Sequence, residues 1–271
     1  MGPIGIFDSG YGGLTILSDI RKRLPNYDYL YLGDNARAPY GTRSFDVVYD
    51  YTLQAVNELF DRGCEMVILA CNTASAKALR TIQQNDLPKT GPEKRVLGVI
   101  RPSTEIIGQF SATKTIGVLA TPGTVASKSY EIEISKFSPQ CKVYQHACPS
   151  WVTLIESNEH QTEAGKGIIR QDVEMLMDSN DAIDTIILGC THYPVLKDYI
   201  ESIVPTSVQI VAQGKIVSDS LADYLNRHPW MDEKCTKGGS VRFLTTESSE
   251  EFNQNASNYI DATVNSLHIT L

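Results

Sequence analysis

Short apolar runs alternate with longer segments of helical periodicity along most of this sequence, and this alternation limits the possible fold more than any other feature. Two of the longer segments, 44–62 and 163–177, have the spacing of amphipathic helices. Such alternation is typical of α/β proteins with mainly parallel sheets, whose ligand sites lie at the carboxyl ends of strands. Nine apolar runs are predicted strands: residues 4–7, 29–32, 66–70, 96–100, 115–120, 142–146, 185–188, 208–211 and 241–244.

Two pairs of these runs resemble each other, which indicates an internal repeat. Segments 66–71 and 186–190 are both apolar runs that end in a small residue followed by a cysteine. Upstream of each lies a strand that begins with glycine, at 5–9 and at 117–121, and the glycine-to-cysteine separations are similar. We therefore expect two similarly built halves that face each other and place the two cysteines across one cleft.

The two cysteine segments, 71–74 (Cys-Asn-Thr-Ala) and 190–194 (Cys-Thr-His-Tyr-Pro), are the strongest candidates for chemistry. Each cysteine stands between a buried strand and a polar turn that begins a helix, where backbone N–H groups favour the thiolate. One such cysteine is more often a small buried residue, but two of them favour a function. Asp8 in the first half and His192 in the second give each thiol its own titratable neighbour, as acid–base catalysis requires.

Segment 8–13 (Asp-Ser-Gly-Tyr-Gly-Gly) opens a helix directly after a strand. A dinucleotide fingerprint needs glycine at position 15, where this chain has Thr15, so nucleotide binding is disfavoured. The segment is then either a tight strand–helix turn or a site where backbone N–H groups hold a carboxylate, with Asp8 as a helix cap or a reacting group. In the following loop, Tyr40 and Gly41 offer a hydroxyl and an exposed N–H to a ligand.

Charge and composition exclude several classes of protein. The chain has 24 Lys and Arg against 32 Asp and Glu, and its net charge of -8 disfavours general nucleic-acid binding. No run approaches the roughly 20 apolar residues of a membrane span, and the N-terminus lacks the features of a secretory signal. Six cysteines without a Cys-x-x-Cys pair disfavour a disulfide framework, a structural zinc site and redox exchange. We expect a cytoplasmic protein with reduced thiols.

The remaining cysteines and three of the histidines belong to no recognisable motif, so the sequence predicts no metal ligands. We interpret these cysteines as packing or surface residues and assign no cluster to the histidines. They are Cys64, Cys141, Cys148 and Cys235, and His146, His160 and His228.

The motif segments together resemble the glutamate racemases of the aspartate/glutamate racemase superfamily. The matching segments are 5–14, 39–41, 70–74 and 189–194, and they follow the family's order over most of the chain. The resemblance implies two pseudo-symmetric α/β domains with the active site in the cleft between them. It also implies that the C-terminal segment returns to pack with the N-terminal half.

The family layout gives expected domain bounds of 1–98 plus 210–271 for the first domain and 99–209 for the second. The resemblance further implies a homodimer. The only ligand that it leads us to expect is a small molecule, glutamate. The resemblance implies no binding to nucleic acid or membrane, and no metal or cofactor.

The resemblance also assigns roles to individual residues. Cys71 and Cys190 correspond to two catalytic bases on opposite faces of the substrate, assisted by Asp8 and His192 respectively. Glu156 corresponds to a further carboxylate that some members place near the second cysteine. The family's substrate contacts fall on Asp8, Ser9, Tyr40, Gly41, Asn72, Thr73, Thr191 and His192.

The implied reaction is the interconversion of L- and D-glutamate without pyridoxal phosphate, supplying D-glutamate for peptidoglycan synthesis. Cys71 would take the proton from D-glutamate and Cys190 from L-glutamate. An unperturbed thiol, with a pKa of about 8.5, is close enough to neutrality to serve as acid or base.

Two segments depart from the family pattern. Arg101 and Ser103 stand where glutamate and glycine are common, and residues 211–215 lack the usual acidic stretch of small residues. Regulation therefore does not carry over from the resemblance. Three alternatives stay open: a racemase for aspartate or another acid, a non-catalytic binding module of the same fold, and a nucleotide-binding oxidoreductase.

Overall fold

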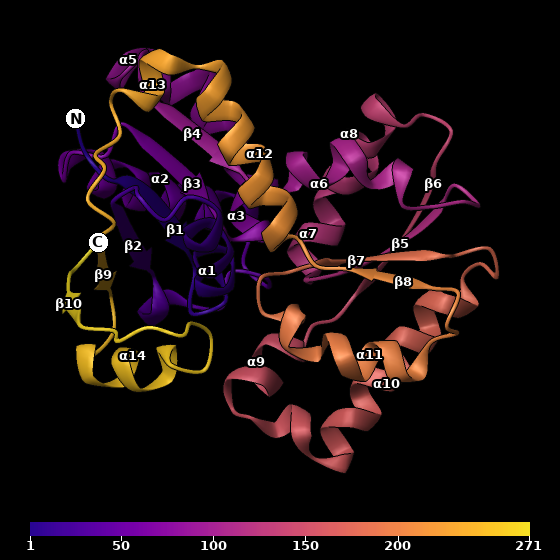
Figure 1. Cartoon of the computed structure of the whole chain (residues 1–271). Coiled ribbons are helices and arrows are strands. Elements are labelled where there is room, and N and C mark those ends of the chain that lie inside the picture. Colours follow the sequence, from indigo (N-terminus) through magenta and orange to yellow (C-terminus); the bar gives the residue numbers. More distant parts are fainter.

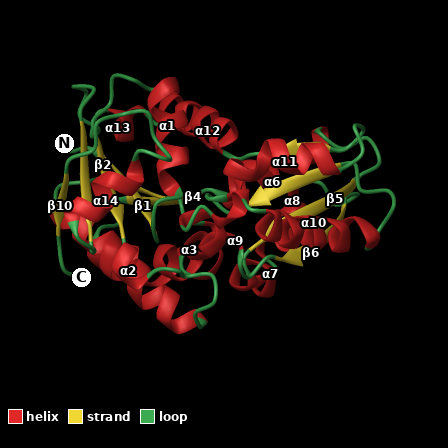
Figure 2. Cartoon of the chain, turned by 90° about the horizontal axis from the view of Figure 1, so that it is seen from below, coloured by secondary structure: helices red, strands yellow, loops and turns green.

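Ten strands form two sheets, and every pair of neighbouring strands is parallel. The computed structural model describes residues 1–271 and shows two lobes side by side (Figures 1 and 2). The strands are β1 (Ile4–Asp8), β2 (Tyr29–Gly33), β3 (Met66–Leu69), β4 (Arg95–Gly98), β5 (Thr115–Ala120), β6 (Lys142–Ala147), β7 (Thr185–Gly189), β8 (Gln209–Val211), β9 (Val241–Thr245) and β10 (Ser266–His268).

The two sheets repeat one strand order, which confirms the internal repeat. The sheet of the first lobe runs β10-β9-β2-β1-β3-β4, and the sheet of the second lobe runs β6-β5-β7-β8. Within them, β2-β1-β3-β4 corresponds to β6-β5-β7-β8, so β1 is equivalent to β5 and β3 to β7. The C-terminal strands β9 and β10 extend the first sheet, as the resemblance implied (Figure 1, yellow).

Helices cover both faces of each sheet (Figure 2). The long ones are α1 (Gly13–Arg23), α2 (Phe45–Asp61), α8 (Ser129–Phe137), α10 (Glu163–Asp178), α12 (Gly214–Arg227) and α14 (Ser249–Ala256). The short ones are α3 (Asn72–Lys77), α4 (Leu79–Thr81), α5 (Leu87–Thr90), α6 (Ile100–Ile106), α7 (Pro122–Ser127), α9 (Trp151–Glu156), α11 (Lys197–Ile203) and α13 (Pro229–Asp232).

Helix α2 illustrates how local sequence sets these elements. The Ser44 side chain accepts a hydrogen bond from the Val47 N–H and caps the first turn. Val48 and Leu59 lie on the face that is buried against the first sheet. The helix ends before Gly63, whose φ of 93° is a left-handed conformation that glycine adopts without strain.

The chain crosses between the lobes twice, and the two crossings touch. Residues after β4 lead into α6, and residues after β8 lead into α12. Between them, the buried Gln213 side chain donates hydrogen bonds to the Val99 carbonyl at 3.1 Å and to Ser103 Oγ at 2.9 Å. The two segments that depart from the family pattern thus contact each other at the connection between the lobes.

The structure corrects the predicted strands in two places. Strand β10 was not predicted, because two of its three residues are exposed and it pairs through its backbone at a sheet edge. The predicted strand 96–100 ends at Gly98, and Ile100 already belongs to α6. The expected boundary between residues 209 and 210 cuts through β8, which pairs with β7, so we propose that the second domain extends to Val211.

No helix combines the length and hydropathy that a membrane crossing needs.

Candidate active site

A narrow cleft between the lobes gathers residues that follow β1, β2 and β3 of the first lobe and β5 and β7 of the second. The enclosed cavity is about 20 Å³, close to the space that one water requires, so the lobes must separate to admit a larger ligand. Its lining consists of Ser9, Gly10, Ala38, Pro39, Tyr40, Gly41, Cys71, Asn72, Thr73, Thr121, Val152, Glu156, Cys190, Thr191 and His192.

Cys71 and Cys190 lie in this one cleft, as the internal repeat predicted. They follow the equivalent strands β3 and β7, and both are buried. Ten of the eleven site residues proposed from the sequence line the cleft, and the eleventh, Asp8, is fully buried directly behind it. Two thiols from opposite lobes therefore face a shared space.

Cys71 is held by the start of its own helix and by the first strand. Its sulfur accepts a hydrogen bond from the Ala74 N–H at 3.4 Å, and the Ser9 hydroxyl lies 3.4 Å away. Burial, with the added repulsion of Asp8, raises the pKa of the Cys71 thiol to about 12 despite these two contacts. Cys71 is therefore a thiol at neutral pH.

Cys190 is paired with an imidazole. His192 Nδ1 lies 3.9 Å from the Cys190 sulfur, and Nε2 lies 2.9 Å from the carboxylate of Glu156. Burial opposes the charged ring, but the contacts with Cys190 and Glu156 outweigh it and raise the pKa of His192 to about 10. A protonated imidazole next to the sulfur can hold or deliver a proton there.

Asp8 connects the lobes instead of bonding to Cys71. Its carboxylate accepts hydrogen bonds from the Gly10 N–H at 2.9 Å and from the Thr191 hydroxyl at 3.3 Å. Burial raises its pKa, although the nearby His192 and these donors counteract the shift. Asp8 therefore acts on Cys71 only through space, and the side chain that donates to it belongs to the opposite lobe.

Gly12 explains why the glycines of segment 8–13 are needed. A Cβ at this position would lie 2.4 Å from Thr191 Oγ1 and 2.5 Å from His192 Nδ1. The two lobes thus approach each other so closely that only a hydrogen fits between them. The sequence left two interpretations of this segment open, a tight strand–helix turn and a site where backbone N–H groups hold a carboxylate. The close contacts of Gly12 favour the tight turn.

Polar groups for an anionic ligand line the first-lobe side of the cleft. Asn72 accepts a hydrogen bond from the Tyr130 hydroxyl at 2.8 Å, while its own Nδ2 is buried without a partner. The Thr73 hydroxyl is hydrogen-bonded to that of Thr121, from the second lobe, at 2.9 Å. An unpartnered buried amide donor is costly unless a ligand completes it, so Asn72 points to an acceptor that arrives from outside.

The structure corrects the expectation for Tyr40. Its hydroxyl donates to the buried carboxylate of Asp34, so it does not offer a free hydroxyl to the cleft. Tyr40 and Gly41 nevertheless line the cavity. Tyr40 therefore contributes shape and position, and the side-chain donors come from the neighbouring segments.

Sequence reasoning missed three residues around the cleft. Thr121 stands at the position equivalent to Ser9, which the internal repeat alone could have indicated. Val152 lines the cavity from α9 and carried no signal. Tyr259, from the chain beyond α14, packs the edge of its ring against His192 with the ring centres 5.8 Å apart.

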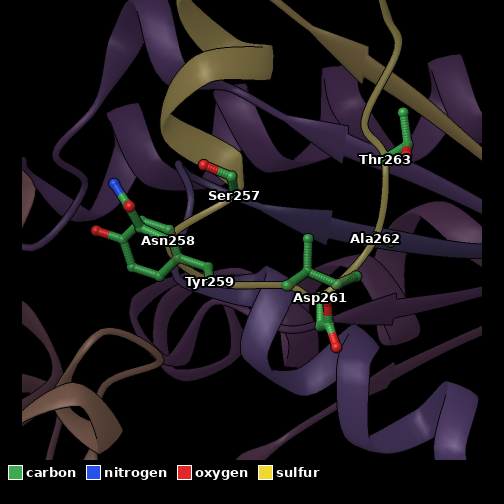
Figure 3. Close-up of a pocket in the computed structure, with 7 residues that line it drawn as sticks. Ser257, Asn258, Tyr259, Asp261, Ala262 and Thr263 are labelled. Carbon is green, nitrogen blue, oxygen red and sulfur yellow. The ribbon is translucent and has the colours of Figure 1, made fainter.

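The larger hollow of the molecule lies elsewhere. It has a volume of about 570 Å³, opens widely to solvent and is lined by the loop of residues 257–263 (Figure 3). It contains no thiol, histidine or lysine. The paired thiols Cys71 and Cys190 and the imidazole of His192 line the narrow cleft, so we assign the candidate active site there.

One group of side chains outside the cleft contradicts the sequence interpretation. His146, which had no assigned cluster, lies with Cys148 and Asp172 in the second lobe. Asp172 comes from α10, more than 20 residues along the chain, so no local spacing could reveal the group. All six cysteines are free, as expected.

Comparisons with known proteins agree with this geometry. A family model described as Asp/Glu/Hydantoin racemase matches residues 15–217. A glutamate racemase of Roseobacter denitrificans is 41% identical over 267 residues, covering 95% of this chain and 96% of the relative. One from Streptococcus mutans is 35% identical and covers 99% of this chain and 98% of the relative.

Solved structures of similar proteins match the whole fold. Glutamate racemase isoform RacE1 from Bacillus anthracis has a TM-score of 0.90 at 31% identity, covering 100% of this chain and 98% of that chain. Glutamate racemase from Francisella tularensis, in complex with D-glutamate, has a TM-score of 0.86 at 32% identity, covering 99% and 97%. The resemblance found in the sequence is confirmed, and the chain belongs to the Asp/Glu/Hydantoin racemase family.

Proposed function

We propose that this protein is a glutamate racemase that interconverts L- and D-glutamate with two cysteines as its acid and base. One observation carries the proposal: Cys71 and Cys190 follow equivalent strands of the two lobes and line the same cleft. The names of the similar proteins supply the substrate, and one of their structures holds D-glutamate.

Racemisation requires that a proton leave one face of the α-carbon and that another arrive on the opposite face. A thiolate on one side and a thiol on the other achieve this without turning the substrate, and they exchange protonation states in each turnover. We assign Cys190 to the proton of L-glutamate and Cys71 to that of D-glutamate. In this assignment the buried Cys71 thiol is the proton donor when L-glutamate binds.

His192 and Glu156 act as partners of Cys190 in this scheme. A protonated His192 returns its proton to the sulfur or holds it nearby, and Glu156 keeps the ring charged and oriented. Asp8 is the counterpart in the first lobe, placed to adjust the protonation of Cys71 through its negative charge.

The substrate carboxylates would be held by side-chain and backbone donors of the cleft. Asn72 Nδ2 is the strongest candidate because it is buried without a partner. Ser9, Thr73 and Thr191 supply hydroxyls around it, and Gly41 supplies a backbone N–H. Donors aimed at the α-carboxylate also stabilise the negative charge that develops when the α-proton leaves.

The two thiols supply both proton-transfer groups, so the scheme calls for no pyridoxal phosphate or other cofactor. The D-glutamate formed would serve peptidoglycan synthesis in the cytoplasm. A homodimer and a cytoplasmic location are predictions from the sequence and its family.

The test is incubation of the purified protein with L-glutamate in D2O, without added pyridoxal phosphate. We expect the circular dichroism signal of the amino acid to decay to zero while NMR shows deuterium at the α-carbon. The same measurement starting from D-glutamate should reach the same end point. L-aspartate in a parallel sample distinguishes a related racemase, because exchange there and not with glutamate would reassign the substrate.

Absence of α-proton exchange with either glutamate enantiomer would contradict the proposal. If glutamate still bound in that case, by calorimetry, the protein would be a binding module of the racemase fold. Binding of a nicotinamide nucleotide would instead favour the oxidoreductase alternative.

A further inference from the structure

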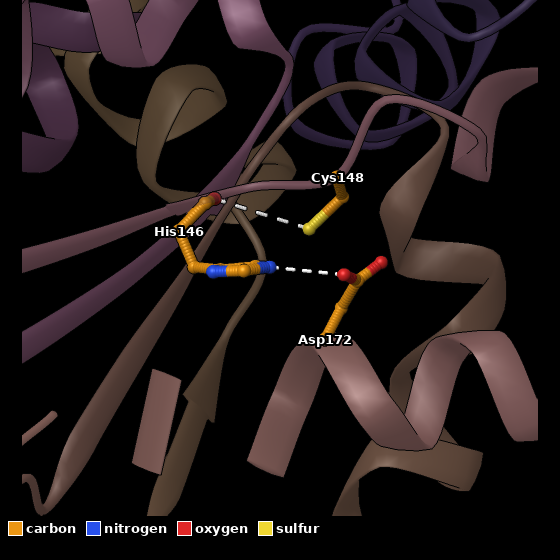
Figure 4. A group of neighbouring side chains, drawn as sticks. All are labelled: His146, Cys148 and Asp172. Atoms are coloured by element: carbon orange, nitrogen blue, oxygen red, sulfur yellow. Dashed lines mark hydrogen bonds and ion pairs between the residues drawn. The ribbon is translucent and has the colours of Figure 1, made fainter. Parts of the chain in front are cut away.

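Three potential metal ligands converge in the second lobe, outside the cleft (Figure 4). His146 lies in β6, Cys148 directly follows that strand, and Asp172 projects from α10. Their ligand atoms, an imidazole nitrogen, a sulfur and a carboxylate oxygen, all lie within 4.8 Å of one another. None of the three lines the cavity that holds Cys71 and Cys190.

Existing hydrogen bonds already orient two of the ligands. His146 Nε2 lies 2.9 Å from Asp172 Oδ1, and the Trp151 indole donates to Asp172 Oδ2 at 2.7 Å. Trp151 thus holds one oxygen of the Asp172 carboxylate, and the other oxygen faces the imidazole of His146. Such outer partners are a regular feature of metal sites, where they set the orientation of the ligands.

The third ligand is a buried thiol without a strong partner. Cys148 is 1% exposed, and the only hydrogen bond of its sulfur is a long one of 3.9 Å to the His146 carbonyl. The Cys148 carbonyl accepts a hydrogen bond from the Tyr193 hydroxyl at 3.1 Å, which holds the backbone of the cysteine in place. The sulfur therefore faces the space shared with the imidazole and the carboxylate and has little else to bind.

Charge balance favours a divalent cation in this space. A thiol that coordinates a metal cation is deprotonated outright. The thiolate and the carboxylate then carry two negative charges, equal to the charge of the ion.

We propose that His146, Cys148 and Asp172 bind a thiophilic divalent cation of the Zn²⁺ class, with water in a fourth, open position. A nitrogen, a sulfur and an oxygen ligand suit zinc, and ligands of one tetrahedral ion lie about 3.4 Å apart. The imidazole and carboxylate must therefore separate slightly from their present 2.9 Å. Binding releases the Cys148 proton to solvent and moves the imidazole proton from Nε2 to Nδ1.

The ion can reach the site from solvent. The side chains of His146 and Asp172 are 19% and 15% exposed, so two of the ligands stand at the surface while the sulfur lies beneath them. All three ligands belong to one lobe, so the site does not depend on closure of the cleft.

The test is a titration with Co²⁺, a spectroscopic substitute for Zn²⁺, under reducing and anaerobic conditions. Because Cys71 and Cys190 are also thiols, the full-length chain carries Cys71→Ser and Cys190→Ser as the common background. We expect one equivalent of Co²⁺ to give the visible bands of a tetrahedral ion and a near-ultraviolet cobalt–thiolate band. Addition of Zn²⁺ should remove both by displacement.

Substitutions then identify the ligands. Cys148→Ala should abolish the thiolate band. His146→Ala should weaken Co²⁺ binding by more than about a hundredfold, which is a larger loss than the removal of a residue that only orients a ligand causes. Trp151→Phe removes the indole bond to Asp172 and shrinks a buried ring, so in a protein whose circular dichroism shows an intact fold it should weaken binding by about tenfold. Cys141→Ala, a half-buried cysteine that joins no such group, is the matched control and should leave the titration unchanged.

The absence of a thiolate band in the background chain would overturn the proposal. So would a band that survives Cys148→Ala in a protein whose circular dichroism shows an intact fold. If Cys148→Ala fails to fold, the His146→Ala titration decides, because that side chain is partly exposed and its removal leaves the core in place.

Discussion

The lobe that carries Cys71 and the lobe that carries Cys190 place a thiol after equivalent strands, yet they surround it differently. Burial and the nearby Asp8 carboxylate raise the pKa of the Cys71 thiol to about 12, although a hydroxyl and a backbone N–H contact its sulfur. Cys190 has an imidazole whose own pKa is raised to about 10 and which is bonded to Glu156. The repeated fold supplies the symmetry, and a few side chains remove it.

The difference between the lobes matters for the proposed reaction, because two-base catalysis needs an acid and a base at the same moment. Two identical environments would favour the same protonation state on both sides of the substrate. Asp8 and His192 are the titratable neighbours that break this equality, and the Thr191 hydroxyl bonds Asp8 across the interface. Each lobe thus completes the site of the other, so neither lobe alone holds a working pair.

The largest effects should come from removing the thiols one at a time. Cys71→Ser and Cys190→Ser should each lower racemisation by about 10²–10⁴-fold, the usual contribution of a positioned acid or base. The two variants should differ in their primary isotope effects with α-deuterated substrate. Cys71→Ser should show the larger effect with D-glutamate and Cys190→Ser with L-glutamate, because the weakened base makes its own proton transfer limiting.

Racemisation rates and isotope effects from both enantiomers, by circular dichroism, provide the measurement for the thiol variants. Cys141→Ser is the control and should keep full activity. Equal isotope effects in the two cysteine variants would contradict the assignment of Cys71 to the α-proton of D-glutamate and of Cys190 to that of L-glutamate.

The contact between the lobes can be tested at Gly12. The methyl group of Gly12→Ala would collide with Thr191 and His192 of the second lobe, while the αR backbone at this position accepts alanine. We expect kcat/KM to fall by about a hundredfold, as for a 1 Å misplacement of a reacting group. The fold of the isolated lobes should be unaffected, so the circular dichroism of the protein should not change.

Gly167→Ala is the matched control for Gly12→Ala. Nothing lies within 4 Å of a Cβ at Gly167, which stands within α10, so the free energy of unfolding should rise by about 0.4–1 kcal/mol with unchanged activity. Full activity in Gly12→Ala would show that the lobes do not need this close approach in catalysis.

A smaller effect should follow when Glu156 loses its charge. Glu156→Gln lowers the pKa of His192 from about 10, so the alkaline limb of the pH–rate profile should move to lower pH. At alkaline pH the rate should fall by about tenfold, a loss no larger than the free-energy contribution of one charge-assisted hydrogen bond. Glu159→Gln, an exposed glutamate three residues along the chain, should leave the profile unchanged.

The same variant makes a prediction about stability, whose sign follows from the direction of the shift. Because the folded protein raises the pKa of His192 from 6.5 to about 10, the resulting stability is fully present below pH 6.5 and is lost as pH rises through about 10. Glu156→Gln should therefore reduce the free energy of unfolding most below pH 6.5. Denaturation curves of variant and wild type that differ most above pH 10 would contradict this origin of the shift.

Much of the site could be predicted because parallel strands bring their carboxyl ends together. Segments 8–13, 71–74 and 190–194 each follow an apolar run, and that position placed each of them at the carboxyl end of its sheet. The partners of individual side chains were not predictable. Tyr40 bonds to Asp34 and Asp8 to Thr191, and such choices depend on how whole elements pack.

The sequence by itself determined nine of the ten strands, the parallel α/β class and the repeat that pairs Cys71 with Cys190, because hydrophobic periodicity and turn residues act over a few neighbouring positions. Only the tertiary structure decided that β10 forms beside β9, how Tyr259 reaches His192, and that His146, Cys148 and Asp172 meet. These contacts join residues far apart in the chain, so they depend on the packing of complete helices and sheets and leave no local pattern to read.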